Sequence, residues 1–233
     1  MKNLVISLIA AKGTSKGVKK KNFLKIQNKT LLEISILSSL KCKQIDKTYV
    51  SSESEKILHI AKKYNCEIIK RPKKLSMFNA KGIEVVKHFC RSIGQETKKT
   101  NPIIILLQPT SPLRSILHIK KSLRLFKNKK LKSLISVKKN KNSPFKDMVI
   151  KNKKLKSITS INNLFKNRQE FPQTYKPNGA IFIFYYKDLM NGKSFLRNAH
   201  PYVMNNISSI DIDTYMDFKE SKKYFKRIHG KFF

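Results

Sequence analysis

Acidic residues are scarce in this chain of 233 residues, which has 14 aspartates and glutamates against 51 lysines and arginines and a formal net charge of +37. Only seven of the basic residues are arginine, and the lysines are spread over almost every segment. Proteins that read base edges favour arginine for its two-pronged donor geometry and gather their basic residues in one stripe. The distribution therefore argues against nucleic acid as the primary partner, while a basic surface would still attract small anionic substrates.

Paired cysteines and long apolar runs are also missing. Cys42, Cys66 and Cys90 form no CxxC pair and lie in apolar segments, which predicts buried free thiols in a reducing compartment. The apolar run at residues 4–11 is too short for a membrane span and has no credible cleavage site after it. We therefore expect a cytoplasmic protein with no membrane segment, in which this first run is a core strand.

Apolar runs of strand length alternate with segments of helical spacing along most of the chain. We expect strands at 4–10, 48–51, 66–69, 103–107, 134–137, 180–186 and 207–212, and helices at 31–40, 53–64, 83–93, 116–126 and 214–225. This alternation indicates an α/β fold with a mainly parallel sheet, which binds ligands at the carboxyl ends of its strands. Residues 138–177 break the rhythm and are predicted to form an irregular arm within a single domain, 1–233.

A loop that contains two glycines follows the first expected strand. Its sequence at residues 13–17, GTSKG, lacks the lysine beside Ser or Thr that defines a Walker A loop. The glycines still allow successive backbone N–H groups to point inward as an anion nest, and the lysines around them add positive charge. The loop is thus either a phosphate site or an exposed basic turn.

A second loop, QPTSPLR at residues 108–114, follows the strongest apolar run. Its two prolines would fix the directions of Gln108, Thr110, Ser111 and Arg114 at the ligand edge of the sheet. The alternative is a rigid connection from strand to helix that Ser111 caps. The density of polar groups favours a function.

Two carboxylates stand close together near the C-terminus, in the segment SIDIDT at residues 209–214. In a strand, Asp211 and Asp213 would share one face, where a cation would offset their repulsion. Hard oxygen ligands near phosphate suit Mg²⁺. The alternatives are that lysines neutralise the pair, or that Asp213 only caps the helix that follows.

A fourth group of polar residues comes before the 180–186 strand. Arg168 precedes the proline of a turn and could clamp a carboxylate, and the Asn178-Gly179 pair allows a tight bend into the strand. Both features could equally be structural.

Taken together, AAKGTSKGVKKKN, LLQPTSPLR, NRQEFP, KPNGAIFIF and SIDIDT resemble the acylneuraminate cytidylyltransferases, which include the CMP-sialic, legionaminic and pseudaminic acid synthetases. The resemblance runs from residue 4 to about residue 225. It implies a Rossmann-like three-layer α/β fold, a homodimer formed partly through the arm, and a requirement for CTP and Mg²⁺. It also implies that the anomeric hydroxyl of a nonulosonic sugar acid attacks the α-phosphate of CTP and releases pyrophosphate.

Position by position, the resemblance also implies site residues. The catalytic phosphate contacts fall on Lys12, Lys16 and Lys21, the nucleotide contacts on Ser15, Asn22, Arg71 and Gln108, the sugar contacts on Arg168, Lys176 and Asn178, and the metal ligands on Asp211 and Asp213. Lysine replaces the family's usual arginine at position 12, and Ser52-Glu53 replaces its usual Thr-Asp. Residues 78–82, FNAKG, depart from an Asp-x-Ala-Ser segment near the base and ribose.

Two other functions remain open from the sequence. One is a nucleotidyltransferase that acts on a different sugar. The other is a non-catalytic basic binding protein on the same fold, which would bind DNA or RNA in a salt-dependent way and release no pyrophosphate.

Overall fold

The apolar runs of the sequence form one large sheet in the computed structural model, which describes residues 3–15 and 17–230. In spatial order the strands are β11 (His200–Val203), β7 (Ser133–Lys139), β10 (Tyr175–Tyr185), β6 (Ile103–Leu106), β1 (Val5–Ala10), β4 (Lys47–Ser52) and β5 (Glu67–Lys70). All neighbours are parallel except β10, which pairs antiparallel with both β6 and β7. The predicted mainly parallel α/β fold is confirmed.

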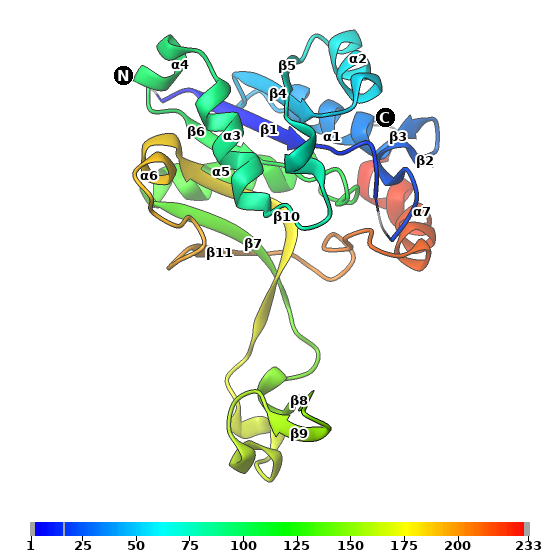
Figure 1. Cartoon of the computed structure of the whole chain (residues 1–233), viewed down its shortest axis with the longest axis vertical. Coiled ribbons are helices and arrows are strands. Elements are labelled where there is room, and N and C mark those ends of the chain that lie inside the picture. Colours follow the sequence, from blue (N-terminus) through cyan, green and yellow to red (C-terminus); the bar gives the residue numbers. More distant parts are fainter. Residues whose placement is uncertain (1–2, 16, 231–233) are drawn as a thin grey trace.

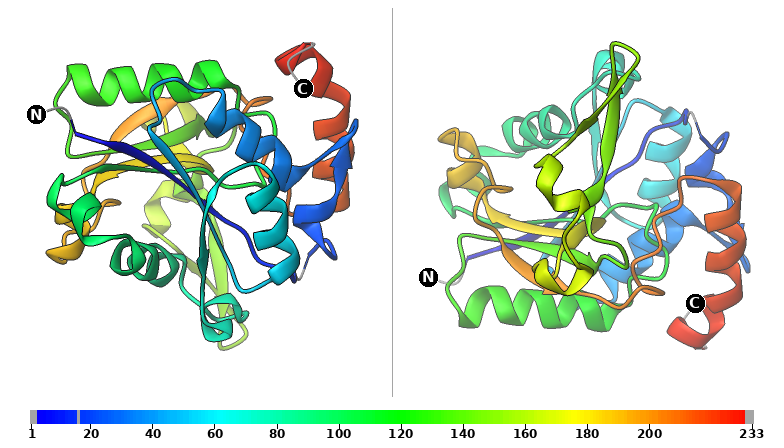
Figure 2. Two further views of the ribbon diagram at one scale, coloured as in Figure 1. Left: turned by 90° about the horizontal axis from the view of Figure 1, so that it is seen from above. Right: turned by 90° about the horizontal axis from the view of Figure 1, so that it is seen from below.

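Helices cover both faces of this sheet and complete the three layers seen in Figures 1 and 2. One face packs against α1 (Leu31–Leu40), α2 (Glu55–Lys63) and α5 (Ile116–Asn128), and the other against α3 (Gly82–Ser92) and α6 (Tyr186–Met190). The central strands β1 and β6 contribute buried side chains to both layers, which explains why their sequences, apart from the buried Ser7, are apolar at every position rather than at alternate ones.

The last helix, α7 (Tyr215–His229), begins at Thr214, which forms a reciprocal capping box with Asp217. Phe218 and Phe225 of this helix join a third apolar cluster with Ile210 and Ile212. The strand expected at 207–212 is wrong. Residues 206–209 form a turn instead, and β11 takes the edge position in the sheet because Ile210 and Ile212 are buried under α7.

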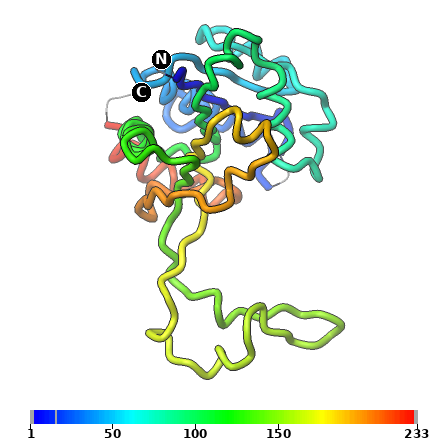
Figure 3. Tube along the Cα trace, turned by 90° about the vertical axis from the view of Figure 1, so that its left-hand side faces the viewer, coloured from blue at the N-terminus to red at the C-terminus, as the bar shows by residue number. Residues whose placement is uncertain are grey.

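The predicted arm lies between β7 and β10 and projects away from the sheet, as Figures 1 and 3 show. It carries a hairpin of β8 (Met148–Lys151) and β9 (Lys154–Ser157). Large apolar side chains of the arm are exposed, among them Ile150, Leu155 and Phe165. The remaining short elements are β2 (Lys25–Ile26), β3 (Lys29–Thr30), α4 (Gln95–Lys99) and the 3-10 turns η1 (Lys21–Phe23), η2 (Lys73–Ser76), η3 (Pro144–Lys146), η4 (Ile161–Leu164) and η5 (Arg168–Glu170).

The three cysteines are buried free thiols, as the sequence predicts. Burial raises the pKa of Cys66 to about 11 and that of Cys90 to about 12, so neither is a ready nucleophile. Within residues 3–15 and 17–230, no helix combines the length and the apolar composition that crossing a membrane would need.

Candidate active site

The glycine-containing loop after β1 is closed by its own hydrogen bonds. The side-chain amide of Asn22 donates to the Lys12 carbonyl at 2.8 Å, and the Lys21 backbone N–H donates to the Ser15 hydroxyl at 3.0 Å. Ser15 in turn donates to the carbonyl of Val18. These bonds fix Lys12, Ser15, Val18, Lys21 and Asn22 relative to one another at the carboxyl end of β1. The segment 12–22 is called the phosphate loop below. Lys16, the third lysine predicted for catalysis, lies outside the described residues.

Both glycines of the phosphate loop are needed for close packing. A Cβ on Gly13 would lie 2.9 Å from the Cβ of Ser54, and one on Gly17 would lie 2.4 Å from the backbone oxygen of Asp213. The loop is therefore held between the end of β4 on one side and the acidic segment 211–213 on the other. Two segments far apart in the sequence thus contact each other only because these positions have no side chain.

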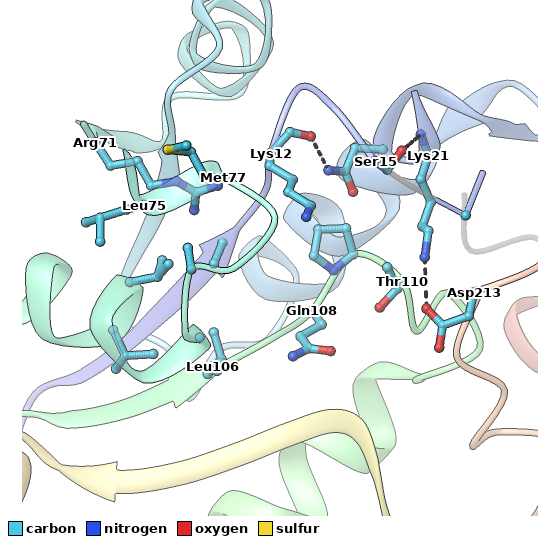
Figure 4. Close-up of a pocket in the computed structure, with 18 residues that line it drawn as sticks. Lys12, Ser15, Lys21, Arg71, Leu75, Met77, Leu106, Gln108, Thr110 and Asp213 are labelled. Atoms are coloured by element: carbon cyan, nitrogen blue, oxygen red, sulfur yellow. Dashed lines mark hydrogen bonds and ion pairs between the residues drawn. The ribbon is translucent and has the colours of Figure 1, made fainter. Parts of the chain in front are cut away.

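An ion pair strengthens the second of these contacts. The ammonium of Lys21 lies 3.0 Å from Oδ1 of Asp213, with the lysine side chain only 12% exposed and the aspartate side chain 76% exposed. Figure 4 shows this pair among the residues that line a cavity. The predicted phosphate-binding lysine and one predicted metal ligand therefore lie side by side.

On the other side of the loop, Glu53 accepts hydrogen bonds from three segments. Its carboxylate receives the Gly13 backbone N–H at 2.7 Å, the Ser76 hydroxyl, and the guanidinium of Arg71 at 3.2 Å. Burial alone would raise the pKa of Glu53, but the hydrogen bonds from Ser76 and Gly13 and the charge of Arg71 outweigh it and lower the pKa. The sequence marked Glu53 only as a departure from the family. In the structure its carboxylate orients Arg71.

A first cavity of about 430 Å³ lies at the carboxyl ends of β1 and β6, where Arg71, Lys21 and Asp213 are among the residues that line it (Figure 4). One end is apolar and the other is polar. The apolar end is lined by Leu75, Met77, Val85, Val86 and Leu106, and Figure 4 places Arg71 beside Leu75 and Met77. The polar end is lined by Lys12, Ser15, Lys21, Asn22, Gln108, Thr110 and Asp213. The cavity thus unites every described residue that the sequence predicts for the phosphates and the nucleotide. We call it the nucleotide cavity.

A second cavity of about 490 Å³ adjoins the first, and Asp213 lines both. Lys176, Asn178 and Asp211 also line it, as predicted for the sugar and the metal. Its other charged residues are Lys138, Lys139, Lys141, Asp217 and Glu220. We call it the basic cavity.

Asp211 is the residue most in need of a cation. Its Oδ1 is buried and accepts no hydrogen bond. Burial raises the pKa of Asp211, and the charges of Asp213 and Asp217 raise it further, although the Thr110 hydroxyl and the Lys21 ammonium oppose the shift. A buried carboxylate oxygen without a donor, next to other carboxylates, fits a hard divalent cation. No group of three or more His, Cys, Asp or Glu suited to a metal occurs among the described residues, so most ligands of such a cation would be water and phosphate oxygen.

Two residues predicted for the sugar are placed less directly. The side-chain amide of Asn178 is buried, accepts from Ser136 and the Ala180 backbone N–H, and donates to Ser209 and Met204. Its hydrogen-bonding capacity is used within the protein, and a direct sugar contact stays a prediction.

Arg168 lies on the arm and is exposed. It lines a small hollow of about 130 Å³ rather than the basic cavity, and donates to the Lys141 carbonyl. Lys141 and Asn140 line both spaces, so Arg168 is one residue removed from the basic cavity.

The QPTSPLR loop differs from expectation at two residues. Ser111 is buried and lines neither cavity, and Ser115 rather than Ser111 caps α5. Arg114 was expected at the ligand edge of the sheet, but its side chain is fully buried below the loop, where it donates to backbone carbonyls. An arginine in a loop between a strand and a helix gives no sequence signal of such burial.

A model of the family described as cytidylyltransferase matches residues 6–231. The chain belongs to this family. It is 32% identical over 223 residues to the N-acylneuraminate cytidylyltransferase of Escherichia coli O18:K1:H7, covering 94% of this chain and 51% of that protein. It is 31% identical over 217 residues to the CMP-N,N'-diacetyllegionaminic acid synthase of Campylobacter jejuni, covering 92% of each.

The chain thus spans about half the length of the first of these relatives and nearly all of the second. Its fold also matches the structure of a CMP:2-keto-3-deoxy-manno-octonic acid synthetase complexed with CTP, with a TM-score of 0.71, 13% identity, and coverage of 97% of this chain and 99% of that one. At this identity the match bears on the fold alone.

Proposed function

We propose that the protein transfers CMP from CTP to a nonulosonic (sialic-type) sugar acid and releases pyrophosphate. The observation that carries the proposal is the pair of adjoining cavities that share Asp213. One is lined by the predicted nucleotide residues and the other by Lys176 and Asn178, two of the three residues predicted for the sugar. The relatives named for N-acylneuraminate and legionaminic acid chemistry support the same substrate class.

The nucleotide cavity suits CTP because its two ends differ in polarity. The apolar end fits a pyrimidine and ribose, while the side chains of Lys12 and Lys21 supply positive charge for a triphosphate. Figure 4 shows the Lys12 ammonium directed into the cavity. The Arg71 guanidinium lines the wall, and all three of its nitrogens donate to protein oxygens, those of Ser76, Ser51, Ala11 and Glu53. Positioning and electrostatic stabilisation of this kind carry phosphoryl-type transfers, with little covalent chemistry by the protein.

Mg²⁺ would be held by Asp211 and Asp213, where the unpaired Oδ1 of Asp211 needs a cation. When bound, it would neutralise developing charge on the phosphates. Lys21, which reaches Asp213 across the boundary between the cavities, would turn to the departing pyrophosphate. The anomeric hydroxyl oxygen then bonds to the α-phosphorus, and the bond between the α-phosphorus and the oxygen that bridges to the β-phosphorus breaks. Pyrophosphate leaves with that oxygen, and the hydroxyl proton is lost to solvent.

The basic cavity, named for its four lysines, is lined by Lys138, Lys139, Lys141 and Lys176 and also by four carboxylates, those of Asp211, Asp213, Asp217 and Glu220. It would suit a sugar acid once Mg²⁺ on Asp211 and Asp213 offsets part of that negative charge and leaves the lysines in excess. These charges would attract the sugar carboxylate, and Arg168 would reach it through the shared wall at Asn140 and Lys141. The arm offers a surface for a second copy of the chain, because it projects with Ile150, Leu155 and Phe165 exposed. We therefore propose a homodimer.

We also propose a cytoplasmic location, since three buried free thiols suit a reducing compartment.

The test is pyrophosphate release by the purified chain with CTP, Mg²⁺ and a panel of nonulosonic acids. We expect turnover with CTP and at least one member of the panel, and none with ATP, GTP or UTP. Turnover only with a sugar outside this class would indicate a nucleotidyltransferase of different specificity. No pyrophosphate with any sugar, together with salt-dependent binding to DNA or RNA, would favour the non-catalytic binding protein.

A further inference from the structure

The largest fully buried side chain in the described part of the protein is that of Arg114. One guanidinium nitrogen, Nη1, donates to the carbonyls of Gln108 at 2.9 Å and Ala180 at 3.0 Å, and Nη2 donates to the Ser35 hydroxyl at 3.0 Å. Nε has no hydrogen-bond partner, and no carboxylate of the described residues lies within 4.0 Å of this guanidinium. Arg114 is thus a buried cation held only by neutral oxygens.

Two of those oxygens belong to segments that line the cavities: Gln108 lines the nucleotide cavity, and Asn178, two residues before Ala180, lines the basic cavity. Ala180 follows Gly179 at an irregularity in the pairing of β10 with β7. Gly179 has φ of +73°, and a Cβ there would lie 2.7 Å from Oε1 of Gln108 and 3.3 Å from Oδ2 of Asp211. Gln108, Gly179 and Asp211 therefore meet at one point, and Arg114 holds two of the three segments from beneath.

A merely structural role does not account for this arrangement. Burial lowers the pKa of Arg114 to about 9, because no charged partner offsets the lost hydration. Well-packed apolar residues often replace buried charges with no loss of stability. If position 114 only filled space in the core, methionine would therefore serve as well as arginine. Two backbone carbonyls on separate segments, in contrast, can be bridged by one planar guanidinium in fixed directions.

We propose that Arg114 is a positioning residue, which fixes the backbones at Gln108 and Ala180 so that the two cavities meet in the geometry that transfer requires. The inference rests on the proposed cytidylyl transfer. Since Arg114 holds the junction and lines neither cavity, its loss should disturb the alignment of two bound substrates more than the binding of either one.

The experiment compares Arg114→Met, Arg114→Lys and the matched control Arg124→Met, which makes the same change at an exposed site on α5. Steady-state pyrophosphate release is measured with the best sugar of the panel, and thermal unfolding is measured in parallel. For Arg114→Met we expect kcat to fall roughly a hundredfold, the usual cost of a displacement near 1 Å. The KM for CTP and the KM for the sugar should both stay within about threefold of the wild-type values. The unfolding temperature should equal or exceed that of the wild type.

Arg114→Lys keeps the positive charge but loses the planar guanidinium that donates in two directions, so we expect about a tenfold loss of kcat. Arg124→Met should match wild type in every measurement. Wild-type kcat in a folded Arg114→Met would overturn the inference. If that variant does not fold, wild-type kcat in Arg114→Lys would overturn it instead. A lower unfolding temperature with unchanged kinetic constants would make the role structural only. An inactive wild-type chain would overturn the proposed function itself, and this inference with it.

Discussion

The Lys21 ammonium and the Asp213 carboxylate, 192 residues apart in the sequence, lie 3.0 Å from each other and join the phosphate loop to the acidic segment. The neighbouring carboxylate has no such partner, because Oδ1 of Asp211 is buried without a hydrogen bond. The two aspartates are therefore not equivalent. Asp213 is exposed and already paired, whereas Asp211 is the one that a cation would stabilise most.

This difference predicts distinct effects for two substitutions. Asp211→Asn and Asp213→Asn should each remove most turnover in pyrophosphate release, and the loss should persist when the Mg²⁺ concentration is raised. Only Asp211→Asn should keep or increase the free energy of unfolding in urea, because burial opposes the charge that it removes. Asp188→Asn, which breaks an ion pair with Lys193 away from both cavities, is the control. Near-normal activity of both active-site variants would rule out the metal role.

The second prediction concerns Arg168 on the arm. Arg168→Ala should raise the KM for the sugar acid more than the KM for CTP, because Arg168 adjoins the basic cavity through Lys141 and does not line the nucleotide cavity. Because Arg168 is exposed, an arginine–carboxylate pair there is worth about 0.5–1 kcal/mol, or roughly two- to fivefold in the KM for the sugar. Arg124→Ala serves as the control. Equal changes in both KM values would move Arg168 out of the sugar site.

The sequence was a good guide to the sheet and to the nucleotide cavity, because each signal was local. Continuous apolar runs predicted β1 and β6, and loops directly after those strands predicted where Lys12 and Gln108 would lie. The strand expected around Asp211 failed because alternation in SIDIDT also suits an extended segment whose apolar side chains pack under α7.

What the sequence could not show depends on contacts between distant segments. The carboxylate of Glu53 bridges Gly13, Arg71 and Ser76, and the guanidinium of Arg114 bridges Ser35, Gln108 and Ala180. A single chain read in order shows neither the burial of these side chains nor the carbonyls that they meet.

The third prediction concerns acid stability. The pKa of His118 is lowered to about 4, first by burial and then by the positive charge of Arg114. The pKa of His229 is also lowered to about 4, because burial outweighs the hydrogen bond with the Pro112 carbonyl. The unfolded value is near 6.5. A lowered pKa in the folded state means that the stabilisation is complete above pH 6.5 and is lost as the pH falls from 6.5 through 4.

Each such imidazole contributes about 3 kcal/mol to the free energy of unfolding at neutral pH. Urea unfolding measured from pH 7.5 to 4 should therefore show a steep fall below pH 6.5. His229→Gln keeps a donor for the Pro112 carbonyl and should make the fall shallower, whereas His59→Gln, at an exposed position on α2, should not. If the free energy of unfolding fell with pH equally steeply in the wild type and both variants, His229 would not titrate between pH 6.5 and 4.

The last prediction concerns the altered segment 78–82 beside the nucleotide cavity. Lys81 is exposed and occupies the position before α3, where its side chain makes no capping hydrogen bond, while Gly82, the first residue of the helix, lines the cavity. A serine at position 81 could do two things. It could accept a backbone N–H of the first turn, which stabilises a helix by about 1 kcal/mol, and it could reach the ribose of CTP.

Lys81→Ser should therefore lower the KM for CTP about two- to tenfold, the value of one neutral hydrogen bond, with kcat unchanged. Two further variants separate the two effects. Lys81→Asp caps the helix as well as serine does but repels a triphosphate, so it should stabilise the fold while raising the KM for CTP. Lys81→Ala removes the lysine and supplies no cap. If serine and aspartate raise the unfolding temperature equally and neither lowers the KM for CTP, position 81 only caps α3. The altered segment would then not be what sets CTP affinity, and the remaining charge of the phosphate loop would account for it.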